Sequence, residues 1–162
     1  MSASQRARAA VQDLAPGMSL GLAETAAEFA RPAVIALVAD SADTARLRLA
    51  RLRPHMSDRL IGLGPEDALA DGPVVPDCYI IDADLRGQNR GLRLMSELRS
   101  RAAAGRHAGM CILHDGNRAE VAPVAFDLGA GDVVPADCDS VELAVRVRAI
   151  LRRKAMDELS RI

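Results

Sequence analysis

The chain has 162 residues, of which 49% are hydrophobic, so it is long enough for one compact domain with a short extension. With a net charge of −1, one Tyr, two Phe and no Trp, it lacks the positive field and the stacking side chains of general nucleic-acid binding. No apolar run reaches the roughly 18 residues of a membrane span, and no signal peptide is evident. Three cysteines without a CxxC pair argue against a disulfide framework or a zinc site. We therefore expect a cytoplasmic protein with neither a nucleic acid nor a membrane as partner.

The N-terminal segment, residues 1–31, is rich in Ala, Gln, Glu and Arg and is interrupted at "APGMS". Such a pattern predicts one or two short helices outside the core. Pro32 ends the segment, because the residue before a proline is pushed out of the helical region. We expect these residues to form a helical extension or a linker.

Predicted strands and helices alternate from residue 33 onward. The run "AVIALVAD" (33–40) is typical of a strand buried on both faces. A helix over 43–53 follows, with Leu47, Leu49 and Leu52 near helical spacing and Pro54 at its end. The next predicted elements are a strand over 59–63, a short helix over 65–70 and a third strand, "DCYIID", over 77–82.

The second half continues the alternation. It predicts a helix over 91–104, a strand over 109–114, a helix over 117–131 with Pro123 near its start, and a short strand over 132–135. The last predicted helix begins at Asp139, in a capping arrangement with Glu142, and runs to residue 162. At about 1.5 Å per residue this helix is longer than a domain of this size needs.

Five strands alternating with helices predict an α/β fold, a doubly wound five-stranded parallel sheet with helices on both faces. In such sheets the functional crevice lies at the carboxyl ends of the strands. Asp40, Asp82, His114 and Ala136 would then meet at one edge of the sheet.

Two stretches, "DCYIID" and "AFDLGAGDVVPADCDSVELAVRVRAILRRK", resemble the receiver domain of bacterial response regulators, a flavodoxin-like (CheY-like) module that is phosphorylated on an aspartate. The second stretch is similar to the second, degenerate receiver of PleD-type diguanylate cyclases, in its Leu-Gly-x-x-Asp turn and its Arg/Arg/Lys end. The resemblance implies a receiver-like domain over 32–154. It also implies that 155–162 ends a connector helix to a GGDEF output domain.

The same resemblance assigns the phosphorylation site position by position. The acidic pair falls on Ala39 and Asp40, and the phosphoacceptor falls on Asp82. The switch hydroxyl falls on His114 and the lysine on Ala136. Losing the lysine removes the cation that would pair with the phosphate, so the resemblance implies a degenerate receiver that requires no cofactor. Asp40, Asp82 and Asp84 would still allow a partial Mg²⁺ site.

Simpler roles remain open for these residues. Asp40 and Asp82 could be strand-end carboxylates that accept backbone N–H bonds, and His114 could be a hydrogen-bonded loop histidine. The basic run over 146–154 is typical of a solvated helix face.

Three functions compete on this sequence. The first is a non-enzymatic pseudo-receiver that acts in dimerisation or docking beside a diguanylate cyclase output domain, in two-component or c-di-GMP signalling. The second is a phosphoacceptor receiver, phosphorylated on Asp82 with Mg²⁺ by a sensor histidine kinase. The third is a small-molecule enzyme or nucleotide-binding protein of the same architecture. For a homodimer or a docked domain, the predicted interface residues are Val121, Val124, Leu128, Met156, Leu159 and Ile162.

Overall fold

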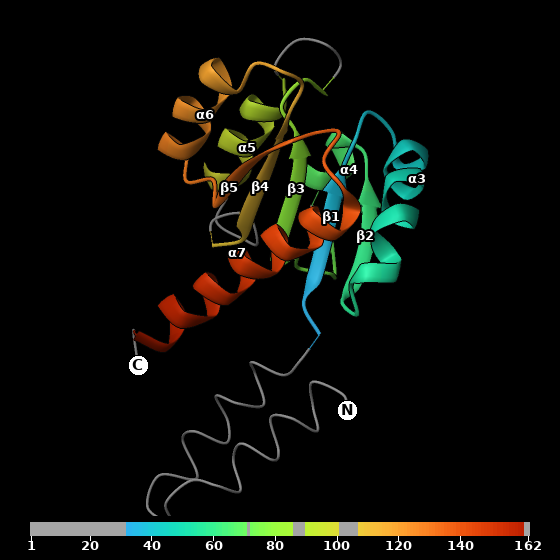
Figure 1. Cartoon of the computed structure of the whole chain (residues 1–162). Helices are drawn as coiled ribbons and strands as arrows, with labels where there is room; N and C mark the ends of the chain where they lie inside the picture. Colours follow the sequence, from blue (N-terminus) through green and yellow to red (C-terminus); the bar gives the residue numbers. More distant parts are fainter. Residues whose placement is uncertain (1–31, 71, 86–89, 101–106, 161–162) are drawn as a thin grey trace, which may run out of the picture. The chain divides into compact units, whose positions relative to one another are not determined.

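The computed structural model describes residues 32–70, 72–85, 90–100 and 107–160 (Figure 1). The helices predicted within 1–31 and the end of the helix predicted over 91–104 lie outside these ranges. One compact unit spans Ala33–Lys154. Within the described ranges, no helix is both long enough and apolar enough to cross a bilayer.

The compact unit is built on a sheet of five parallel strands in the order β2-β1-β3-β4-β5. The strands are β1 (Val34–Val38), β2 (Arg59–Leu63), β3 (Cys78–Asp82), β4 (Gly109–His114) and β5 (Asp132–Pro135). The predicted fold class is confirmed: this is the flavodoxin-like, CheY-like receiver fold. The predicted bounds of β2, β4 and β5 agree with the structure, because each of these strands lies between residues that favour turns.

Helices connect successive strands or, in the case of α7, follow the last strand, and they cover both faces of the sheet. They are α3 (Ala42–Leu52) with the 3₁₀ turn η1 (Arg53–His55), α4 (Pro65–Leu69), α5 (Arg90–Ser100), α6 (Arg118–Asp127) and α7 (Ser140–Ser160). Alternate residues of each strand pack against opposite layers, as the period of two in a strand requires. Ile81 and Met110 pack with α5 and α6, whereas Ile80 and Cys111 pack with α3 and α7.

Three local features differ from the sequence expectations. Leu47 is 73% exposed, and Ala45 joins Leu49 and Leu52 as the buried face of α3, so the helix is rotated relative to the predicted stripe. Pro123 is the sixth residue of α6 rather than near its start. At α7, Asp139 Oδ1 accepts the Val141 N–H at 2.9 Å, as an N-cap does, whereas the Glu142 carboxylate pairs with Arg146.

Candidate functional site

The carboxyl ends of the parallel strands bring four of the predicted site residues to one edge of the sheet. Asp82 is the last residue of β3, the central strand, and His114 is the last residue of β4. Asp40 follows β1, the neighbour of β3, and Ala136 follows β5 directly. Because all strands run in the same direction, these positions lie at the edge where doubly wound folds hold their ligands.

The Asp82 carboxylate has protein partners at both oxygens. Its Oδ2 accepts a hydrogen bond from Arg48 Nη1 at 3.1 Å, which is also an ion pair. Its Oδ1 accepts the backbone N–H of Asp84 at 3.0 Å. The Asp82 side chain is 17% exposed and that of Arg48 is 41% exposed. Arg48 comes from α3 and was not among the residues predicted for this site.

Ala39 lies in the apolar core. It is 1% exposed, packs with the layer of α3 and α7, and donates its backbone N–H to the carbonyl of Leu63 at 3.1 Å. A carboxylate at this position would have to be buried among apolar side chains, which is costly unless it is paired. The first position of the acidic pair is therefore part of the packing of the sheet.

His114 is buried, at 7% exposed. Neither of its ring nitrogens has a hydrogen-bond partner among the described residues. The expectation of a hydrogen-bonded loop histidine is therefore wrong, because the residue ends a strand and is buried. A neutral imidazole has one N–H donor and one acceptor nitrogen, and burying both without partners destabilises the fold.

Ala136 is joined to β4 through its backbone, whose N–H donates to the carbonyl of His114 at 2.8 Å. Both Ala136 and the following Asp137 are exposed. The position that the resemblance assigns to a lysine therefore carries a methyl group, with a carboxylate beside it.

The three carboxylates of the predicted Mg²⁺ site do not form a metal-binding group. Across residues 32–70, 72–85, 90–100 and 107–160, no three His, Cys, Asp or Glu side chains are arranged to hold a metal ion. Mg²⁺ needs oxygen ligands in near-octahedral geometry. Asp82 already accepts a hydrogen bond from Arg48 at one oxygen and from a backbone amide at the other. The residues present therefore do not fit Mg²⁺ in this arrangement.

The predicted interface residues have different environments. Val124 and Met156 are 46% and 57% exposed, whereas Leu128 and Leu159 are half-buried. Val121 is only 5% exposed and packs in the core with α5, so its assignment to an interface is wrong. Ile162 lies outside the described residues.

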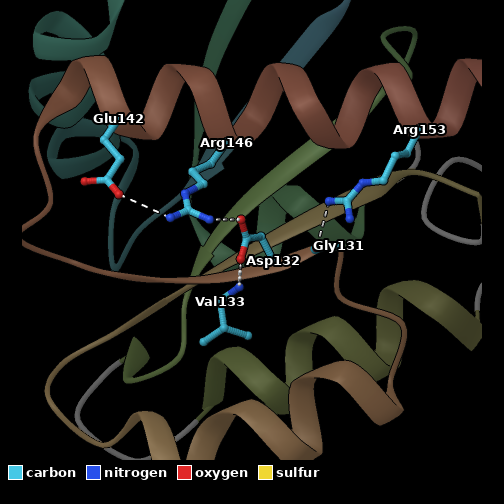
Figure 2. A network of polar contacts seen from close by, with 6 residues as sticks. All are labelled: Gly131, Asp132, Val133, Glu142, Arg146 and Arg153. Carbon is cyan, nitrogen blue, oxygen red and sulfur yellow. Dashed lines mark hydrogen bonds and ion pairs between the residues drawn. The ribbon is translucent and has the colours of Figure 1, made fainter.

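A polar network connects α7 to the start of β5, at the amino ends of the strands and thus opposite the candidate site (Figure 2). Arg146 pairs with Asp132 at 3.4 Å and with Glu142 at 3.3 Å, while Asp132 Oδ1 also accepts the Val133 N–H at 2.9 Å. Arg153 donates to the carbonyl of Gly131 at 2.9 Å. The hydrogen bond that Arg146 donates to the Glu142 carboxylate and the charge of Asp132 raise the pKa of Arg146, so this guanidinium keeps its charge. The predicted solvated face of α7 thus carries contacts that hold the helix to the sheet.

Similarity to known proteins is found at the level of structure. No protein-family model and no curated protein sequence matches the chain. A sensor protein from Polaromonas sp. JS666 superposes with a TM-score of 0.64 and 17% identity, over 76% of this chain and 98% of that one. A CheY-like response regulator receiver domain protein from Methanospirillum hungatei JF-1 gives 0.65 and 12%, over 78% and 99%. NtrX from Brucella abortus gives 0.68 and 19%, over 80% of this chain but 29% of that protein. These likenesses show the receiver fold.

Proposed function

We propose that the chain is a non-enzymatic signalling module of receiver fold that acts through protein contacts and is not phosphorylated on Asp82 in its normal function. Ala136 carries this proposal. In a working receiver, a lysine at this position pairs with the phosphorylated aspartate, and here a methyl group stands there next to the negative charge of Asp137. A phosphate on Asp82 would lack that lysine, and Asp137 adds negative charge next to the lysine position.

Two further positions at the same edge support the proposal. Ala39 is buried among apolar side chains, and His114 is buried at the hydroxyl position without a hydrogen-bond partner among the described residues. Neither side chain supplies the second carboxylate or the hydroxyl that phosphoryl transfer requires.

We further propose that the module forms a homodimer, or docks on an adjacent output domain of the GGDEF type, in cytoplasmic two-component or c-di-GMP signalling. The "LGAGD" turn after α6 and the Arg/Arg/Lys end at 152–154 support this pairing, as does the resemblance to PleD-type receivers. On α7, Val141 and Val145 lie one turn apart and are 49% and 54% exposed. Exposed apolar residues on one helix suit a protein partner.

The alternative is a phosphoacceptor receiver that takes a phosphoryl group on Asp82 with Mg²⁺ from a sensor histidine kinase. The observation that favours it is the place of Asp82, the last residue of the central strand. It would require Asp82 to leave Arg48 and bind the metal.

Incubation with acetyl phosphate and Mg²⁺, followed by intact-mass measurement, tests the proposal. We expect the mass of the wild type to stay unchanged. We also expect Ala136→Lys alone not to restore full modification, because Ala39 and Asp137 remain. Asp82→Asn serves as the control: a stoichiometric mass gain in the wild type that this substitution abolishes would establish the phosphoacceptor alternative instead.

Assembly is tested by light scattering over a concentration series. We expect a weak homodimer, and we expect Met156→Glu with Leu159→Glu to weaken it by placing charge among apolar contacts. Ser160→Glu is the matched control, because it adds a charge on the same turn without removing an apolar side chain. A wild type that stays monomeric at high concentration would refute the homodimer and leave docking on an output domain.

A further inference from the structure

The ion pair between Arg48 and Asp82 places a positive charge beside the carboxylate that a receiver uses for Mg²⁺ and phosphate. We infer that Arg48 is the resident counter-ion of Asp82 and closes this carboxylate to divalent cations. This inference deepens the proposed function and rests on it, since it takes Asp82 as the acceptor position of a receiver fold.

The packing of α3 fixes where Arg48 can reach. Ala45, Leu49 and Leu52 are at most 1% exposed and hold one face of the helix on the sheet. Gly62 on β2 allows this close approach, because a Cβ added there would lie 3.0 Å from the Ala45 Cβ. The N-cap Ser41, whose Oγ accepts the Thr44 N–H at 3.1 Å, fixes the start of the helix. Arg48 is thus presented from a well-anchored helix to the strand end that carries Asp82.

Arginine is suited to this role because its guanidinium cannot be deprotonated in a protein. Its Nη1 lies 3.1 Å from Asp82 Oδ2, so a positive charge stands beside this carboxylate. A magnesium ion approaching Asp82 would meet this charge and would have to displace Arg48 from Oδ2.

The hydrogen bond at the second oxygen of Asp82 makes Arg48 harder to displace. Oδ1 accepts the Asp84 N–H at 3.0 Å, so turning the carboxylate to free Oδ2 would also break this bond. Arg48 and the Asp84 amide together fix the orientation of the carboxylate, and the Asp82 oxygens serve the fold rather than a metal.

Magnesium titration of the full chain, followed by two-dimensional ¹H–¹⁵N NMR, tests this inference. The variants are Arg48→Gln, which removes the charge, Arg48→Lys, which keeps it, and Arg48→Met, which keeps the apolar stem. Arg46→Gln is the matched control, since Arg46 is on the same helix, is 68% exposed and pairs with Asp43. Because Arg48 is partly exposed and a divalent ion doubles the interaction with a unit charge, removing this charge is expected to lower the Mg²⁺ Kd about fivefold in Arg48→Gln and Arg48→Met. Arg46→Gln and Arg48→Lys should stay within about twofold of the wild type, because the charge near Asp82 is kept in both.

The outcomes separate this inference from the proposed function. Equal Mg²⁺ affinities in the wild type, Arg48→Gln, Arg48→Met and Arg46→Gln would overturn the inference, while an unmodified wild type in the acetyl phosphate experiment would still support the proposed function. Tighter binding in Arg46→Gln to the same degree would overturn the inference too, because it would show a general charge effect. Phosphorylation of wild-type Asp82 would instead refute the proposed function. Thermal melting of each variant verifies that it is folded, and Arg48→Met provides the test if Arg48→Gln is not.

Discussion

The same kind of ion pair is found at both ends of the strands in the parallel sheet, at the carboxyl ends (the carboxyl edge) and at the amino ends (the amino edge). At the carboxyl edge, Asp82 at the end of β3 pairs with Arg48 of α3 at 3.1 Å, and at the amino edge Asp132 at the start of β5 pairs with Arg146 of α7 at 3.4 Å. The exposure of the partners is similar, at 41% and 17% in the first pair and 49% and 19% in the second. The chemistry of the pair therefore does not distinguish the two edges, and the difference must come from what surrounds each pair.

The surroundings give the two pairs different consequences. At the amino edge, other basic side chains also join helices to strand ends: Arg99 donates to the carbonyl of Ala108 at 2.7 Å, and Lys154 pairs with Asp77 at 3.4 Å. The Asp132 pair is one of several such contacts. At the carboxyl edge, Ala39 and Ala136 carry no charge, and Arg48 contacts Asp82, the residue that the resemblance assigns to the acceptor position. The same kind of contact thus holds a helix to a strand at both edges, and at the carboxyl edge it also occupies an oxygen of Asp82.

The largest expected effect comes from Gly91→Ala, which disturbs the carboxyl edge. Gly91 is the second residue of α5, and a Cβ added there would lie 1.8 Å from the backbone oxygen of Asp82 and 2.7 Å from its carbonyl carbon. Because this clash is with backbone, β3 and α5 must separate, and we expect the free energy of unfolding to fall by about 3 kcal/mol. Urea unfolding measures it.

Gly131→Ala is the matched substitution at the amino edge. The nearest atom to its added Cβ is Ile150 Cγ1 at 2.9 Å, the side chain of an isoleucine that can adjust. We expect a loss of about 1 kcal/mol. Equal losses in the two variants would show that the carboxyl edge is no more rigidly packed than the amino edge.

The sequence predicts the sheet and the edge on which Asp82 lies, but not the partner of Asp82. Apolar strands between turn residues, and the right-handed crossover between parallel strands, are enough to place Asp40, Asp82, His114 and Ala136 together. Arg48 is different, because α3 contains several arginines and the helix rotation decides which one faces Asp82. The predicted stripe included Leu47, whereas Ala45 is buried in its place, and this rotation also sets the direction of Arg48. His114 shows the same limit, since no sequence pattern reveals that its ring is buried without partners.

The next expected effect is a loss of stability at alkaline pH, which tests whether the amino edge excludes solvent. Cys78 is the first residue of β3, and burial raises its pKa to about 12, although the charge of Lys154 opposes the rise. In the unfolded chain the thiol ionises near pH 9.0, so above that pH the unfolded chain loses a proton that the folded chain keeps. The protonated Cys78 thiol makes its full contribution to the free energy of unfolding below pH 9. Above pH 9 this free energy should fall by about 1.4 kcal/mol per pH unit. Urea unfolding between pH 8 and about pH 10 measures this slope.

Cys78→Ala is the control for this prediction. Burial also raises the pKa of Cys111, so the variant should keep part of the pH dependence and lose the share of Cys78. A slope that Cys78→Ala leaves unchanged would mean that the amino end of β3 admits solvent to the thiol.

A smaller effect is expected at His114, where the carboxyl edge contains unsatisfied polar atoms. His114→Leu removes two buried nitrogens that lack partners among the described residues, and we expect a gain of about 1 kcal/mol in the free energy of unfolding. His107 precedes β4 at the amino edge and is exposed, so His107→Leu should change the stability by less than about 0.5 kcal/mol. A loss of stability in His114→Leu would show that the imidazole is satisfied in solution and would remove this difference between the edges.

The smallest effect is the coupling energy of the Arg48–Asp82 pair itself. A double-mutant cycle with Arg48→Gln and Asp82→Asn should give about 0.5 kcal/mol at low salt, because the arginine is partly exposed and solvent screens the pair. At the amino edge, the partners Lys154 and Asp77 are only 22% and 14% exposed, so a cycle with Lys154→Gln and Asp77→Asn should give a larger coupling that salt reduces less. A coupling of zero for Arg48 and Asp82 at low salt would mean that the pair does not form in solution. Asp82 would then lack its arginine counter-ion, and the contrast between the two edges would have to rest on Ala39 and Ala136 instead.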